Sequence, residues 1–228
     1  MARGREDRPA QDAPPRAVES LTGQQLERRR RITDAVIDLV AESGPEALQM
    51  REVTARSGVA LATVYRYFSS KDHLLAAAVA DWQDRLTEQV LAETVRRHEA
   101  GGPEEPAVER VLRFARRELR AFQRHPHFAR LMVGLLASSD PYASETLARM
   151  NRSSDRAMDA LLHDVAEPVA RTARVAIQAV VMTGLIGWVT GRKTWAEILR
   201  DLEMVAGQVL ADAGPPPAGP APLRHGGS

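Results

Sequence analysis

The chain contains no cysteine among its 228 residues. A disulfide framework, a thiolate metal site and a thiol nucleophile are therefore excluded. It also lacks an uninterrupted apolar run of the roughly 18 residues that a membrane-spanning helix needs. The N-terminal stretch, Met-Ala-Arg-Gly-Arg-Glu-Asp-Arg-Pro, has none of the apolar character of a secretory signal. From these absences we expect a cytoplasmic protein that has no membrane partner.

Patterns typical of enzymes are missing as well. We find no Gly-rich phosphate loop and no G-x-S-x-G turn. His125 and His127 flank Pro126 without carboxylates at ligand spacing, which is typical of surface residues at a helix junction. The sequence therefore predicts a protein that is not an enzyme, with no catalytic residue, no metal site and no cofactor.

The net charge of +1 does not by itself indicate a nucleic-acid partner. Residues 26–75 contain eight Lys or Arg against seven acidic residues, so the placement of the basic residues is more informative than their number. They are Arg28 to Arg31 in a row, Arg51, Arg56, Arg66 and Lys71. The arginine run is also what a solvated helix start would show.

Residues 48–75 predict two short helices joined at Ser57-Gly58-Val59, followed by a further helix that begins at Ser70. Gly58 is able to take the left-handed conformation that a tight turn between helices needs. The second helix, about Leu61 to Phe68, carries many hydrogen-bonding side chains, which suits a helix laid in a DNA major groove. A solvated helical hairpin with two aromatic rings packed on the core is the alternative.

The string Thr63-Val64-Tyr65-Arg66-Tyr67-Phe68-Ser69-Ser70-Lys71 resembles the T-[VL]-Y-x-[YH]-F-x-[ST]-K stretch that ends the DNA-binding segment of the TetR family of bacterial repressors. The resemblance covers about residues 26–75. It implies an all-α, TetR-like fold with an N-terminal three-helix helix-turn-helix domain and a C-terminal helical domain for ligand binding and dimerisation. It also implies double-stranded DNA with a palindromic operator as a partner.

The resemblance and the helix geometry together predict the residues that contact DNA. They are Gln49, Ala60, Leu61, Ala62, Thr63, Tyr65, Arg66, Tyr67 and Lys71. Family members often have Lys and Gly where this chain has Leu61 and Ala62, so Leu61 is left with apolar groups such as a thymine methyl. Val64 and Phe68 should face inward. His73 stands where an acidic residue is usual, so we expect no acidic capping box there, and Gln49 is a poor cap.

Apolar residues recur with helical period over most of the chain, and Pro and Gly supply the breaks. About nine helices and no strand are expected. The helices beyond the DNA-binding segment should span about 70–97, 105–124, 127–138, 142–164, 168–191 and 195–212. The predicted organisation is an N-terminal arm at 1–22, a DNA-binding domain at 23–72, a ligand-binding and dimerisation domain at 73–212, and a Pro/Gly-rich tail at 213–228. Both ends should be disordered, and the basic arm is able to reach the minor groove.

The helices after residue 100 contain more apolar surface than DNA binding requires. Met and aromatic side chains adapt well to irregular ligands, which favours a cavity, although an ordinary filled core is the alternative for each residue. The candidate ligand-binding residues are Phe122, Phe128, Met132, Leu135, Leu136, Met158 and Met182.

The last two helices are apolar on several faces and should be buried on several faces. A two-fold dimer would bury them and would match palindromic DNA, whereas a central helix buried inside one subunit is the alternative. The candidate interface residues are Leu185, Ile186, Trp188, Trp195, Ile198, Leu202, Val205 and Val209.

Within the family, the chain is similar to the actinobacterial repressors of cholesterol and steroid catabolism, through Ala-Leu-Gln-Met-Arg, the Thr63–Lys71 string, Gln123-Arg124-His125-Pro126 and Gly187-Trp188. This implies a steroid acyl-CoA as the effector that releases DNA, and more broadly a bulky apolar ligand such as a fatty acyl-CoA. A multidrug-responsive regulator and a transcriptional activator are alternatives. A helical lipid- or acyl-CoA-binding protein without a regulatory role is an alternative from another class.

Overall fold

The computed structural model describes residues 18–99 and 105–211, which contain nine α-helices and no strand. After a short 3-10 turn at Val18–Ser20, the helices are α1 (Gly23–Ser43), α2 (Met50–Ser57), α3 (Leu61–Tyr67), α4 (Lys71–Glu99), α5 (Ala107–Arg124), α6 (Pro126–Leu135), α7 (Pro141–Leu161), α8 (Glu167–Val189) and α9 (Trp195–Leu210). The predicted all-α fold is confirmed. The expected arm and tail lie almost entirely outside the described residues, and the arm's last residues form the 3-10 turn rather than an unstructured segment.

The helix starts follow the local sequence. Thr22 caps α1 and Thr194 caps α9, each in a reciprocal capping box with the residue three positions on, Gln25 and Glu197. Pro126 stands in the first turn of α6, where a missing N–H costs nothing. These signals explain why the helices beyond residue 100 begin within about two residues of the predicted positions.

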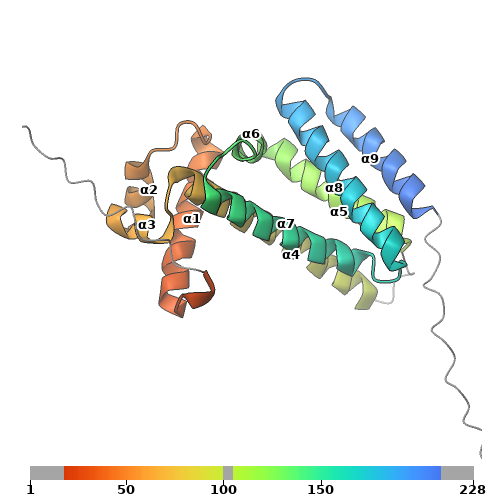
Figure 1. The fold of residues 1–228 in the computed structure, drawn as a ribbon, viewed down its shortest axis with the longest axis horizontal. Coiled ribbons are helices and arrows are strands. Elements are labelled where there is room, and N and C mark those ends of the chain that lie inside the picture. Colours follow the sequence, from red (N-terminus) through yellow and green to blue (C-terminus); the bar gives the residue numbers. More distant parts are fainter. Residues whose placement is uncertain (1–17, 100–104, 212–228) are drawn as a thin grey trace, which may run out of the picture. The chain divides into compact units, whose positions relative to one another are not determined.

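The described chain divides into two compact units. The first comprises residues 18–93 and 118–154, and the second comprises 94–117 and 155–211. In the first unit, α1, α2 and α3 pack against one another, as Figure 1 shows in red to orange. The predicted boundary at residue 72 lies inside the first unit, so the division into a DNA-binding and a ligand-binding domain stays a prediction.

The core of the helix-turn-helix is built around an apolar stripe of α1. Ile32, Val36 and Val40 are fully buried, as are Val53 of α2 and Val64 of α3. Burial of a Val or Ile side chain contributes about 1.5–3 kcal/mol, so these five residues carry much of the stability of this small helical cluster.

A second core of the first unit is aromatic. The Trp82 ring of α4 stacks on Phe128 of α6, with 4.7 Å between the centroids and 11° between the planes, and lies 5.1 Å from the ring of Phe122 of α5. Offset stacking of this kind adds about 0.5–1.5 kcal/mol to the burial of the rings. These contacts hold α4, α5 and α6 together within the first unit.

Helices α8 and α9 of the second unit lie side by side as an antiparallel pair, shown in light blue and blue in Figure 1. They approach closely at Gly184, where a Cβ would lie 2.7 Å from Cγ2 of the buried Ile198. Trp188 and Trp195 meet near the turn, with their centroids 4.5 Å apart. Gly184 is therefore a packing residue, and the close approach depends on its missing side chain.

We predict that Gly184→Ala lowers the free energy of unfolding by about 1–3 kcal/mol, because the new methyl group must displace the buried Ile198. Gly207 of α9 is the matched control, since nothing lies within 4 Å of its Cβ position. Gly207→Ala should raise stability by about 0.5–1 kcal/mol through helix propensity. Urea denaturation followed by circular dichroism measures both, and equal effects of the two substitutions would contradict the close-packing explanation.

Candidate DNA-binding site

The turn between α2 and α3 has the geometry that the sequence predicts. Gly58 is left-handed, with φ 65° and ψ 23°, and its N–H donates to the carbonyl of Thr54 at 3.1 Å. The N–H of Val59 donates to Oγ of Ser57 at 3.3 Å. Val64 and Phe68 are buried, at 0% and 1% exposure, as expected for the inward face of α3. The turn and these two side chains fix α3 against α1 and α2.

The outward face of α3 begins with small and apolar residues. Ala60, Ala62 and Arg66 are exposed, Leu61 is 45% exposed, and Thr63 and Tyr65 are half-buried. Tyr67 differs from the expectation, because it is only 6% exposed and belongs to the core beside Phe68. Its ring has a packing role, and any contribution to DNA binding is limited to an edge of the side chain.

Lys71 connects the starts of two helices. Its ammonium donates to the carbonyl oxygen of Leu48 at 2.8 Å, just before α2, while Lys71 itself begins α4. One of its three N–H donors is used in this way, and two remain for a phosphate. The exposed Gln49 precedes α2 without a side-chain capping bond. The first backbone N–H groups of α2 therefore have no side-chain cap and suit a phosphate oxygen.

Not all the basic residues of this region are available to DNA. Arg29 turns inward, with its side chain 12% exposed, 3.4 Å from Asp81 and with its guanidinium 5.4 Å from the centre of the Phe68 ring. Arg56 binds both carboxylate oxygens of Glu42, at 2.5 and 2.9 Å, and this hydrogen bonding lowers the pKa of Glu42. The other exposed arginines of this region are Arg28, Arg30, Arg31, Arg51 and Arg66, of which Arg30 lies 3.7 Å from Asp34.

The start of α4 has no acidic capping box, as expected, but it is capped by Ser70 and His73. The N–H of His73 donates to Oγ of Ser70 at 2.9 Å, and the N–H of Ser69 donates to Nδ1 of His73 at 3.2 Å. The imidazole thus replaces the carboxylate of a capping box. Its ring stacks on Tyr142 at 5.6 Å, and burial lowers the pKa of His73 to about 4.

The turn between α6 and α7 also binds this helix start. Oγ of Ser138 donates to a carboxylate oxygen of Asp72 at 2.6 Å. Asp140 accepts from the N–H groups of Tyr142 and Ala143, at 2.8 and 2.9 Å, and thereby caps α7. Although burial opposes it, hydrogen bonds from Ser70 and from these two N–H groups hold the pKa of Asp140 below its ordinary value. Residues 69–73 and 138–142 are thus held together by hydrogen bonds.

The candidate ligand-binding residues are divided between the two units. Phe122, Phe128, Met132 and Leu135 are buried in the first unit, at 5% exposure or less, and Met158 is buried in the second. Met182, also in the second unit, is half-buried. The prediction that Leu136 lines a ligand cavity is wrong. This residue follows the last residue of α6, is 49% exposed and points out of the core.

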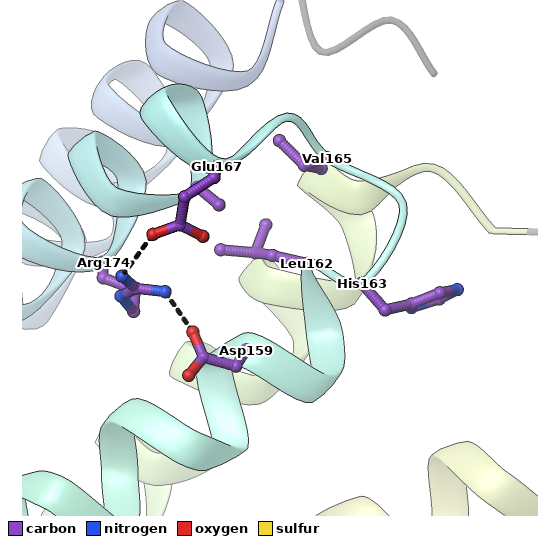
Figure 2. A pocket seen from close by; sticks show the side chains of 7 residues that line it. Asp159, Leu162, His163, Val165, Glu167 and Arg174 are labelled. Atoms are coloured by element: carbon purple, nitrogen blue, oxygen red, sulfur yellow. Dashed lines mark hydrogen bonds and ion pairs between the residues drawn. The ribbon is translucent and has the colours of Figure 1, made fainter. Parts of the chain in front are cut away.

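A pocket of about 260 Å³ lies in the second unit, between the end of α7 and the start of α8. Figure 2 shows Arg174 between Asp159 and Glu167, with both of which it forms ion pairs, and His163 pointing away from them. None of the candidate ligand-binding residues lines this pocket. The pocket is below the usual 300–1,000 Å³ of ligand sites, and its guanidinium is already neutralised, so it suits neither a bulky apolar ligand nor an anion.

The residues expected at a dimer interface also divide into two groups. Leu185, Ile198 and Leu202 are at most 1% exposed within the described subunit, so they pack inside it and cannot reach a partner. The half-buried ones, which remain candidates, are Ile186, Trp188, Trp195, Val205 and Val209. The sequence did not single out the two most exposed large apolar residues of α8 and α9, Val175 at 66% and Met204 at 58%.

Helix α8 has the length and mean composition of a membrane span, although it contains no uninterrupted apolar run of 18 residues. Among the described residues it is the one helix long and apolar enough to cross a membrane, and only 28% of its most apolar stretch is buried. A helix of this composition is equally typical of one that is covered by other protein.

Comparison with known proteins assigns the class. A family model described as bacterial regulatory proteins, tetR family, matches residues 32–78. Relatives that are 32% identical over most of the chain are transcriptional repressors of the same kind. The chain therefore belongs to the TetR family of bacterial transcriptional regulators, and its relatives are repressors and not enzymes.

The relatives include the HTH-type transcriptional repressor KstR of Rhodococcus jostii (strain RHA1), 32% identical over 190 residues, which are 82% of this chain and 85% of that protein. KstR of Mycobacterium tuberculosis (strain ATCC 25618 / H37Rv) is 32% identical over 214 residues, 89% of this chain and 94% of that protein. The chain is thus similar to KstR over nearly its whole length.

Solved structures show the same fold. A TetR transcriptional regulator from Rhodococcus sp. RHA1 superposes with a TM-score of 0.68 at 24% identity, covering 84% of this chain and all of that chain. FadR from Bacillus subtilis superposes with a TM-score of 0.59 at 17% identity, covering 80% of this chain and 97% of that chain.

We predict that Lys71→Met weakens DNA binding by about 1 kcal/mol or more and lowers the slope of log K against log salt by roughly one, because one phosphate contact is lost. Methionine keeps the apolar stem of the side chain. If Lys71 acts only by holding Leu48, affinity will fall while the salt slope stays unchanged. Lys193→Met, at the chain's other lysine, is the control and should change neither quantity. Fluorescence anisotropy at several salt concentrations measures both.

We predict that His73→Gln makes stability less dependent on pH. In the unfolded chain His73 becomes protonated below about pH 6.5, whereas in the folded chain it stays neutral until about pH 4. The wild type therefore loses stability as the pH falls through this window. A glutamine amide oxygen can accept from Ser69 and does not titrate. Between about pH 7.5 and about pH 5, the wild type should lose about 1 kcal/mol more than the variant in urea denaturation. Equal losses would show that the ring is not held neutral.

Proposed function

We propose that this TetR-family repressor binds a palindromic operator as a homodimer and is released by a bulky apolar ligand, a fatty or steroid acyl-CoA. The arrangement of α3 carries the DNA-binding part of the proposal: an exposed face on a helix fixed by Gly58, Val64 and Phe68, next to the uncapped start of α2. We assign residues 23–72 to DNA binding and 73–212 to ligand binding and dimerisation, in a cytoplasmic protein.

The exposed apolar surface of α8 and α9 supports the homodimer. Val175 and Met204 are more than half exposed on helices that are otherwise rich in apolar residues, and little of the apolar stretch of α8 is buried in one subunit. Apolar surface of this kind marks an interface. A second copy of the chain would cover it, and two-fold symmetry would present two recognition helices to half-sites about 34 Å apart.

Two observations support the ligand class. FadR from Bacillus subtilis, which has this fold, was solved in complex with stearoyl-CoA. The described helices of this chain also bury Phe122, Phe128, Met132 and Met158, side chains that adapt to irregular apolar molecules. The ligand must favour the conformation that does not bind DNA, because equal binding to both conformations would shift nothing.

We expect the double substitution Val175→Glu with Met204→Glu to convert the dimer into a folded monomer, because it places two charges on each side of an apolar interface. Both positions are exposed in the subunit, so its core is left intact. Val95→Glu, at a valine of α4 that is 54% exposed, is the control and should leave the dimer unchanged. Sedimentation velocity at micromolar concentration gives the result, and a monomeric wild type would end the proposal of a dimer.

Release is tested on a complex of the full chain with an operator duplex selected from random sequences. Stearoyl-CoA and a steroid acyl-CoA should each be added to the preformed complex, and at least one should dissociate it in an anisotropy assay. If neither does so while cationic multidrug compounds do, the multidrug-responsive alternative is correct. If the chain selects no DNA sequence at all, the regulatory function itself is wrong.

A further inference from the structure

The buried face of α4 contains a polar group that the fold does not explain. Val79, Gln83 and Thr87 follow one another at intervals of four residues on this helix and are at most 9% exposed. Gln83 is thus a polar residue on a face that should be apolar. Its Nε2 donates to Oε1 of Glu118 on α5 at 2.6 Å.

The side-chain oxygen of Gln83, Oε1, has no hydrogen-bond donor within the described part of the chain, although the atom is buried. A buried acceptor without a donor is uncommon in native proteins and costs free energy, because the oxygen has lost its bonds to water. In the observed arrangement Glu118 accepts from the amide N–H of Gln83 and does not donate to Oε1.

Buried apolar residues flank this pair on both helices. Trp82 precedes Gln83 and contacts Phe122 and Phe128, and Leu119, which follows Glu118, is 1% exposed. Burial raises the pKa of Glu118 to about 7, so neutral and charged forms of its carboxyl are both populated at neutral pH. Small-molecule sites are mostly apolar with a few polar groups that orient the ligand, and a buried oxygen without a donor beside aromatic rings is a group of that kind.

We propose that Gln83, held by Glu118, is the polar recognition point for the effector, and that it binds a hydroxyl group on the body of an otherwise apolar molecule. The hydroxyl donates to the unpartnered Oε1 of Gln83. This inference rests on the proposed ligand-responsive function and narrows it to hydroxylated apolar ligands.

The position of Gln83 also links ligand to DNA. It lies on the same helix as Lys71, twelve residues further on, or about 18 Å at the rise of an α-helix. The residues between them include Leu74 and Ala76 to Val79, all of which are buried, so this part of α4 is fixed by packing along its length. A ligand that moves Gln83 therefore displaces the helix that begins at the DNA-binding site.

The test compares CoA thioesters that differ by one hydroxyl group: lithocholoyl-CoA with cholanoyl-CoA, and ω-hydroxystearoyl-CoA with stearoyl-CoA. Binding to the full-length protein is measured by calorimetry without DNA. In at least one pair the hydroxylated probe should bind about five- to tenfold more tightly, the effect of one hydrogen bond. Gln83→Leu should abolish this preference.

Two further variants make the result specific. Glu118→Gln keeps an acceptor for Gln83 Nε2 but adds an amide N–H that can donate to Oε1, so the preference should weaken. Gln89→Leu makes the same substitution as Gln83→Leu at an exposed position of α4 and should preserve the preference. Thermal unfolding checks that Gln83→Leu is folded, as expected when an apolar side chain replaces a buried unpaired oxygen.

The inference is overturned if wild type shows no preference in either pair, because water then satisfies the oxygen, or if the preference survives Gln83→Leu. Failure of all four thioesters to bind overturns it together with the proposed ligand class. A hydroxyl preference that depends on Gln83, combined with no release of operator DNA, supports the recognition point and counts against the proposed release mechanism alone.

Discussion

The start of helix α4 is the point on which the helix-turn-helix and the elements bound to it depend. Three segments are bound there: the loop before α2 through Lys71, the end of the recognition segment through Ser69 and His73, and the turn before α7 through Ser138 and Asp140. Each contact gives a hydrogen-bond partner to a polar group that folding has removed from water. Because these bonds share five consecutive residues, a shift in any one segment changes the position of the others.

The basic residues near the start of α4 show that adjacent arginines have different roles. Arg29 belongs to the same run as Arg28 and Arg30, yet it is turned toward Asp81 and Phe68, while its neighbours remain exposed. The difference follows from helical geometry, since successive residues of α1 point about 100° apart and only one of the run faces α4. A count of Lys and Arg residues in this region therefore overstates the number of positive side chains that are able to contact DNA.

The fold was predictable from sequence because its signals are local. Helical periodicity, Gly58 at the turn, and proline or capping residues at helix starts predicted about nine helices, and the bounds given for those after residue 60 agree with the structure to within about three residues. The inward positions of Val64 and Phe68 followed from the same periodicity. The burial of Tyr67 did not follow from it, because a tyrosine side chain suits both a protein core and a contact with DNA.

Residue roles that depend on long-range packing were less accessible. Leu185, Ile198 and Leu202 have the composition of an interface, but the close approach at Gly184 buries them inside the α8–α9 pair, and Leu136 follows α6 on its exposed side. The Gln83–Glu118 pair joins residues 35 positions apart, and no sequence pattern marks it. The capping role of His73 was missed because capping rules describe carboxylates, whereas an imidazole nitrogen accepts the same bond.

That imidazole cap fixes a tautomer. Because a backbone N–H donates to Nδ1, this nitrogen must hold a lone pair, and the ring proton resides on Nε2. A carboxylate at this position would place a negative charge beside the backbone N–H groups of the helix start, where it would repel an approaching phosphate. The neutral ring adds neither sign of charge, so the electrostatic potential at this end of α4 comes from the helix dipole and from neighbouring charges that include Lys71, Asp72, Asp140, Arg29 and Arg149.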